Sequence, residues 1–141
     1  MFRRSRSRLL RTPSQSLRAA LAVTELAIGL PVVLIVAMGT MEACTMVRLR
    51  QKLKIIAYEG ARVGVLPEAG IVNVEYQCQV LSQDQSLALV DVATEPADPT
   101  TLASGDWFRV EATAPLNANS LTGTWMKSAF SLTESVSIQK P

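Results

Sequence analysis

The residue best placed to do chemistry is Glu25, a carboxylate set inside a long apolar run. Residues 26–41, which follow it, carry no charge, and residues 19–47 contain only two charged side chains, Glu25 and Glu42. A carboxylate inside a bilayer costs roughly 2.5–3.5 kcal/mol on insertion scales, so such a group usually has a partner. Two interpretations follow. Glu25 marks the inner membrane interface and is hydrated there, or it pairs with a positive group supplied by another protein.

Other groups that could carry chemistry are few. The sequence has no histidine, which removes Ser-His-Asp and Cys-His catalysis and histidine-containing metal sites. Its two cysteines, Cys44 and Cys78, are too few for a four-cysteine zinc site. We expect both to be buried small hydrophobic residues rather than a disulfide. The sequence therefore predicts no catalytic residue, no metal site and no cofactor, and we do not expect an enzyme.

The apolar run is long enough to cross a membrane as one helix. A hydrocarbon core of about 30 Å takes about 20 helical residues, and residues 19–47 exceed that length. Pro31 lies inside the run, where a membrane helix tolerates proline as a kink. The run is also longer than the apolar core of a cleaved secretory signal. We therefore expect a transmembrane helix over residues 19–47.

Both flanks of the span are basic. Residues 1–24 carry six arginines and no acid, and we expect residues 1–18 to form an unfolded cytoplasmic leader. A second basic cluster lies at residues 48–54, so the positive-inside rule favours a cytoplasmic N-terminus only slightly. A short basic leader is the easier end to leave untranslocated. The net charge of +2 is too small to indicate a nucleic-acid partner.

Beyond the span the helical pattern becomes amphipathic. Gly64 and Pro67 predict its end. We expect one helix of about 40 residues and about 60 Å, at about 1.5 Å per residue. Apolar residues recur at helical spacing in its second half, at Met46, Leu49, Leu53, Ile56, Gly60 and Val63.

Three later segments alternate apolar and polar residues and predict strands over residues 86–94, 107–114 and 129–139. An antiparallel sheet that covers the amphipathic half of the helix is the natural two-layer arrangement. We therefore expect an α+β domain over residues 48–141, in which the long N-terminal helix packs on a small antiparallel sheet.

Residues 72–80 fit two patterns. Their strict alternation slightly favours a strand. Val74, Cys78 and Leu81 also form a helical stripe, for which Asn73 is a suitable N-cap.

Three N-terminal stretches stand out after the basic leader: residues 19–27 (AALAVTELA), 30–34 (LPVVL) and 39–43 (GTMEA). They combine small residues with a glutamate, an apolar run with Leu-Pro, and a later Gly–Glu step. This pattern resembles the signature of TadE-like pseudopilins. As a combination these motifs are specific, although each piece alone is not.

The resemblance continues downstream and covers most of residues 18–115. Residues 105–115 are similar to the late strand of the family. The family also favours a helix over residues 73–83. A helix-end motif follows Tyr58, and its residues are Glu59, Gly60, Ala61 and Arg62.

The resemblance implies a pilin-like minor subunit of a tight-adherence (type IVc) pilus, which serves surface attachment or secretion. Such a protein is held in the inner membrane by a single span, with its C-terminal domain outside the cytoplasm. Its partners would be other pilin-like subunits, the pilus assembly platform and a prepilin peptidase. In type IV pilin-like proteins this peptidase removes the leader, and the new N-terminal amine meets the glutamate of a neighbouring subunit. Here the cut would fall between Ala20 and Leu21, and Glu25 would be the pairing residue.

Three positions depart from the family pattern. Ala20 stands where prepilins usually have glycine, Thr24 where valine is usual, and Leu26 where an aromatic residue is usual. The sequence leaves open whether the leader is cleaved, and whether the subunit belongs to the tip, the shaft or the platform. The alternative function is a single-pass anchored protein that binds an extracytoplasmic partner and has no role in pili.

Overall fold

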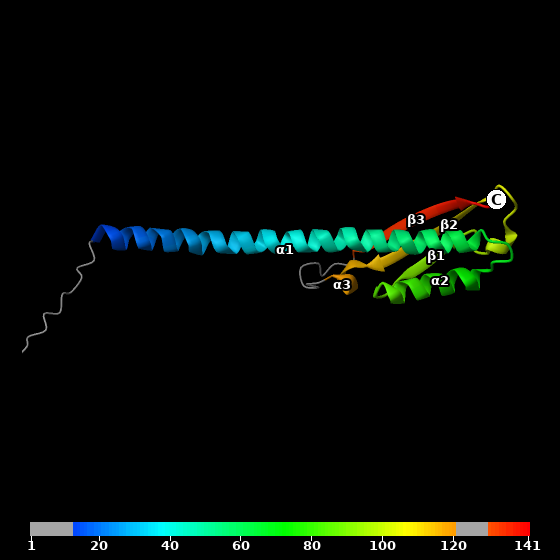
Figure 1. Ribbon diagram of the computed structural model, residues 1–141, viewed down its shortest axis with the longest axis horizontal. Coiled ribbons are helices and arrows are strands. Elements are labelled where there is room, and N and C mark those ends of the chain that lie inside the picture. The colour runs from blue at the N-terminus through cyan, green and yellow to red at the C-terminus, as the bar shows by residue number, and fades with distance from the viewer. Residues whose placement is uncertain (1–12, 121–129) are drawn as a thin grey trace, which may run out of the picture. The chain divides into compact units, whose positions relative to one another are not determined.

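The computed structural model describes residues 13–120 and 130–141 of the 141-residue chain (Figure 1). The chain divides into two compact units, Met1–Thr40 and Met41–Pro141. A long N-terminal helix is followed by a shorter helix and a three-stranded antiparallel sheet, which confirms the expected α+β class. In chain order the elements are α1 (Pro13–Gly64), α2 (Ile71–Asp84), β1 (Asp91–Glu95), η1 (Pro99–Thr101, a 3-10 helix), β2 (Trp107–Pro115), α3 (Leu116–Asn119) and β3 (Ser131–Gln139).

Helix α1 begins earlier than the sequence predicts. It starts at Pro13 and has 52 residues instead of about 40. Proline suits the first helical turn because the N–H that it lacks has no partner there. The expectation of an unfolded leader is therefore wrong for residues 13–18, and residues 1–12 of that leader lie outside the described residues. The helix ends at Gly64, as expected.

The second half of α1 buries one stripe of side chains in the core of the unit Met41–Pro141. Leu53 and Ile56 are fully buried, and Ala57 and Ala61 lie beside them in the same cluster. The spacing of three to four residues puts these side chains on one face of the helix. This is the amphipathic half that the periodicity predicts.

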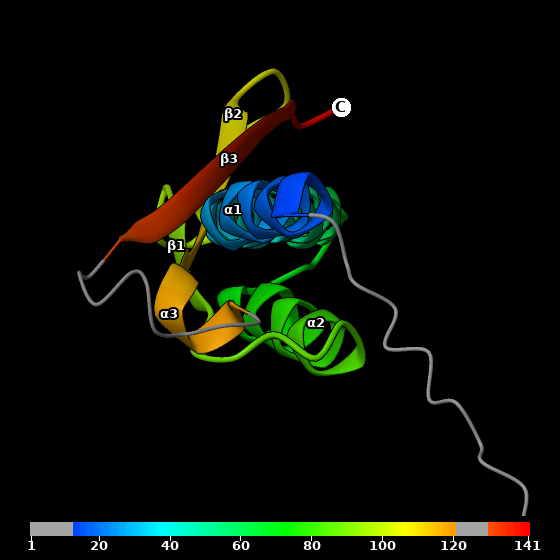
Figure 2. The ribbon, with the colours of Figure 1, turned by 90° about the vertical axis from the view of Figure 1, so that its left-hand side faces the viewer.

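The sheet has the order β1-β2-β3, with β2 in the centre and both pairs antiparallel. In β2 the side chains alternate, so that Phe108, Val110, Ala112 and Ala114 are buried on one face. Val110 is opposite Val136 of β3. The helices cover this apolar face, and α1 and α2 lie on the same side of the sheet (Figure 2).

Two glycines let the layers approach closely. A Cβ atom at Gly60 would lie 2.6 Å from the Sγ atom of Cys78 in α2 and 3.4 Å from Val110 in β2. A Cβ atom at Gly64 would overlap the ring of Phe108. The core of the unit therefore forms where α1, α2 and β2 meet, and glycine is required in α1 on packing grounds.

The segment 72–80 is a helix, as the family resemblance favoured, and the strand suggested by its alternation is wrong. Val74 and Cys78 are buried against α1, whereas Val72, Tyr76 and Val80 remain exposed. The stripe at spacing four therefore outweighs the period of two. Asn73 is not the N-cap, because the helix begins at Ile71 after Gly70 and has no side-chain cap.

The strands also differ from prediction at their starts. The segment expected from residue 86 forms a strand only from Asp91, since Ser86 and Leu89 have φ angles of 53° and 56°, which no strand residue adopts. The third strand begins at Ser131, and residue 129 lies outside the described residues. The second strand, Trp107–Pro115, agrees with the prediction to within one residue.

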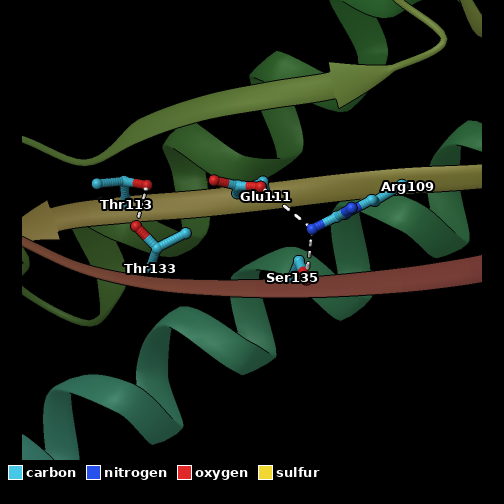
Figure 3. A network of polar contacts seen from close by, with 5 residues as sticks. All are labelled: Arg109, Glu111, Thr113, Thr133 and Ser135. Carbon is cyan, nitrogen blue, oxygen red and sulfur yellow. Dashed lines mark hydrogen bonds and ion pairs between the residues drawn. The ribbon is translucent and has the colours of Figure 1, made fainter.

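The outer face of the sheet is polar (Figure 3). The Nη2 atom of Arg109 donates to Ser135 Oγ at 3.3 Å and lies 3.5 Å from Glu111 Oε2. The hydroxyls of Thr113 and Thr133 are hydrogen-bonded at 2.9 Å. Because this face satisfies its polar groups on the surface, the apolar packing of the sheet is confined to the side of the helices.

Candidate functional site

The candidate site is the part of α1 around Glu25. All residues from 17 to 40 are exposed in the described structure, including every large apolar side chain among them. Between Arg18 and Glu42 the chain has no charged side chain except Glu25. Glu25 is thus a single carboxylate on an apolar helical surface, and none of residues 13–120 and 130–141 packs over that surface. Such a surface needs either lipid or another protein to cover it.

The neighbour of Glu25 is accommodated within the helix. The hydroxyl of Thr24 donates to the carbonyl oxygen of Leu21 at 2.7 Å and lies 3.2 Å from that of Ala20. A threonine satisfied in this way is compatible with apolar surroundings. Thr24 therefore adds no polar group that needs an outside partner.

Ala20, Leu21 and Pro31 all lie within α1. Ala20 and Leu21 are exposed, with Leu21 at 64%. The cut between them stays a prediction, as does the pairing role of Glu25.

In the helix-end motif, two residues pack in the core and the two charged residues form an ion pair at the surface. Gly60 and Ala61 are buried, Gly60 against Cys78 and Val110. Glu59 Oε2 and Arg62 Nη1 lie 3.5 Å apart on the exposed side. The spacing of three residues predicts this pair, but the sequence does not reveal what Gly60 touches, because that depends on α2.

Glu42 and Cys44 lie on different faces of α1. Glu42 is buried with 8% of its surface exposed, one heptad before Leu49 on the core side. Cys44 is exposed because two residues turn the helix by about 200°. The expectation of burial is therefore right for Cys78 and wrong for Cys44. Both thiols are free.

Burial changes the chemistry of Cys78. Removal from water, together with the nearby charge of Glu75, raises the pKa of this thiol to about 11. The Sγ atom lies 3.8 Å from the carbonyl oxygen of Ile56, to which the thiol donates. A neutral buried thiol is a poor nucleophile. Cys78 therefore serves packing rather than reaction.

The sequence did not predict two sets of hydrogen bonds from side chains to distant backbone groups. The Nζ atom of Lys52 donates to the carbonyl oxygen of Gln85 at 2.6 Å and ties α1 to the end of α2. The side chain of Asn119 exchanges two hydrogen bonds with the backbone of Ala88, at 2.9 and 3.0 Å, and donates to Pro115. No local pattern marks either residue, because their partners are 33 and 31 positions away.

A shallow groove of about 590 Å³ lies between α1 and β3. It is lined by the apolar side chains of Ile55, Tyr58 and Val136 and by the polar side chains of Gln51, Lys54 and Glu59. Among residues 13–120 and 130–141, no group of three metal-ligating side chains is gathered anywhere.

In the described part of the chain, α1 is the one helix that is long and apolar enough, by length and composition, to cross a membrane. Fold and site together define a protein with a single N-terminal apolar helix and a small α+β domain.

The family model described as TadE-like protein matches residues 20–62. The chain is TadE-like over this stretch, which confirms the resemblance seen in its N-terminal motifs. The match includes Glu25, Pro31 and the helix-end motif. The similarity of residues 105–115 lies beyond the matched range and stays a prediction. Comparisons with curated proteins and with solved structures found no match.

Proposed function

We propose that this chain is a membrane-anchored, pseudopilin-like subunit for assembly of a tight-adherence pilus. Residues 19–47 of α1 cross the inner membrane once, with the N-terminus in the cytoplasm and the α+β domain outside. Other pilin-like subunits and the assembly platform are its partners. It acts as a structural subunit in surface attachment or secretion, not as an enzyme.

The observation that carries the proposal is the position of Glu25. The TadE-like match covers this residue, which is the one charged group on an exposed apolar helical surface. In lipid an unpaired carboxylate is costly, and an amine from a neighbouring subunit removes most of that cost. Pairing would therefore favour assembly over storage as a single subunit.

Substitution of Glu25 tests the proposal. In cells that build the pilus, Glu25→Gln keeps the size of the side chain and removes its charge. We expect loss of pili, while the chain still resists extraction from membranes by alkaline carbonate. Glu68→Gln, at an exposed acid outside the matched segment, is the control and should leave pili unchanged. Normal piliation with Glu25→Gln would favour the anchored partner-binding protein instead.

A further inference from the structure

A basic collar, defined as Arg48, Arg50, Lys52 and Lys54, directly follows the apolar run of α1. No acidic residue interrupts it, and the next acid along the chain is Glu59. From residue 55 to residue 141 the sequence has ten acidic and only four basic residues. Positive charge is therefore gathered at the end of the apolar run, and the rest of the domain is acidic.

Two side chains of the collar contact other residues of the chain, and the other two are exposed to solvent. Lys52 is half-buried and donates to the carbonyl oxygen of Gln85. Arg50 lies 3.7 Å from Glu134 but keeps 64% of its side chain exposed. Arg48 and Lys54 are exposed, and neither has an ion-pair partner among the described residues. Two full positive charges are thus available to an outside partner.

Arg48 and Lys54 lie on the part of the helix surface that the rest of the domain leaves uncovered. At about 100° per residue, Arg48 and Lys54 lie on opposite flanks of the buried face that carries Leu49 and Leu53. Along the axis they are only about 9 Å apart. A layer that surrounds the helix can contact both side chains at once.

We propose that the basic collar binds the anionic phospholipid headgroups of the bilayer that α1 crosses, with Arg48 and Lys54 as the main contacts. The headgroup layer is about 5–8 Å thick on each side of the hydrocarbon core. Long basic side chains reach this layer while their stems lie along apolar surface. Arg48 directly follows Val47, the last residue of the expected span, and so lies in this layer. Lys54 is about 9 Å further along the helix, and its long side chain reaches back to the layer.

The acidic residues in the rest of the domain restrict membrane binding to the basic collar. Negative side chains beyond residue 55 are repelled by an anionic surface, with a range of about 8–10 Å at physiological salt. Attraction is then confined to the collar, and it weakens as salt is raised. The inference rests on the membrane anchoring in the proposed function, but it needs neither the pilus nor a particular orientation of the chain.

The test uses the full chain reconstituted into vesicles of phosphatidylcholine that contain traces of spin-labelled phosphatidylglycerol or phosphatidylcholine. The measured quantity is the relative association constant of the two labelled lipids with the protein. Arg48→Gln, Lys54→Gln and the double variant remove collar charges. The double variant Arg62→Gln/Arg109→Gln is the matched control, since both arginines are exposed surface residues outside the collar. Arg62 lies about 21 Å further along α1 than Arg48.

We expect the wild-type chain to prefer phosphatidylglycerol, and the preference to fall as salt is raised. Each collar substitution should lower the association constant by up to about fivefold, and the control pair should leave it unchanged. The single variants replace exposed side chains, and their circular dichroism spectra should match that of the wild-type chain.

Three results would overturn the proposal: no preference in the wild-type chain, an equal loss in the control pair, or competition by inorganic phosphate at matched ionic strength, which would indicate a site for free phosphate. Because the vesicles hold no other protein, a preference cannot come from an acidic protein partner. Stable insertion without lipid preference refutes the collar alone. A chain washed from the vesicles by alkaline carbonate refutes the membrane span as well.

Discussion

Gly60 of α1 and Cys78 of α2 are in such close contact that a Cβ atom on the glycine would lie 2.6 Å from the cysteine Sγ atom. Real Cβ atoms essentially never come so close to another heavy atom. The same Cβ atom would lie 3.7 Å from Val74 and 3.4 Å from Val110. Packing of the two helices on the sheet thus depends on the missing side chain at one position of the TadE-like segment.

Substitution Gly60→Ala should therefore destabilise the domain, although alanine is the better helix former. Overpacking costs about 1–3 kcal/mol, and the gain in helix propensity of about 1 kcal/mol offsets only part of it. We expect the melting temperature of the full chain in detergent micelles to fall by several degrees. Cys78→Ala in the same chain should recover part of the loss, because it removes the atom that the new methyl group meets.

Gly39→Ala is the control for this prediction. Gly39 is also inside α1, but nothing lies within 4 Å of the position where its Cβ would be. Alanine there should leave the domain as stable as in the wild-type chain or slightly more stable. Equal destabilisation at both positions would mean that helix propensity, and not contact with Cys78, sets the effect.

Much of this fold is predictable from the sequence because its signals are local. The change from a wholly apolar helix to an amphipathic one, the end of α1 at Gly64 and the alternation in β2 all lie within short windows. A continuous central strand with one buried face leaves little ambiguity, since a shift of one residue would expose Phe108 and Val110.

The sequence predictions fail where contacts between residues far apart in the chain determine the secondary structure. Residues 72–80 alternate like a strand, and only the contact of Val74 and Cys78 with α1 makes them a helix. Leu89 has a positive φ just before β1, and its residue type does not predict this conformation. In the candidate site, the sequence predicts the isolation of Glu25, but a second chain would be needed to show what it meets.

The two cysteines should differ sharply in reactivity. Cys78 is 1% exposed, and burial is the main cause that raises the pKa of its thiol to about 11, whereas Cys44 is on the surface of α1. Cys44 lies within the proposed span, where detergent rather than protein covers it, so at pH 8 in micelles a maleimide that partitions into detergent should label Cys44 in the native chain and reach Cys78 only after denaturation. Mass spectrometry of proteolytic fragments measures both sites. Labelling of Cys44→Ser at Cys78 without denaturant, at a comparable rate, would contradict the packing described here.

The raised pKa of Cys78 also predicts a loss of stability in alkali. The thiol keeps its proton in the folded chain up to about pH 11, whereas the unfolded thiol loses it near pH 9. Between these values the unfolded state binds fewer protons, so the free energy of unfolding must fall as pH rises. Urea unfolding at pH 8, 9.5 and 10.5 measures the slope. Cys78→Ala should flatten it, even though that variant starts from a lower stability because of the cavity.

Cleavage of the leader is the last prediction and separates a processed subunit from a plain anchored protein. A prepilin peptidase that cuts between Ala20 and Leu21 would remove all six arginines of the leader and leave a free amine four residues before Glu25. The mass of the chain from membranes should match residues 21–141 when the peptidase is present, and the full length when it is deleted. Ala20→Gly restores the usual residue before the cut and should speed processing, while Ala20→Leu should slow it. A full-length mass in piliated cells would contradict cleavage. The N-terminal amine of a cleaved subunit could then not be the partner of Glu25, and another cation would have to pair with it.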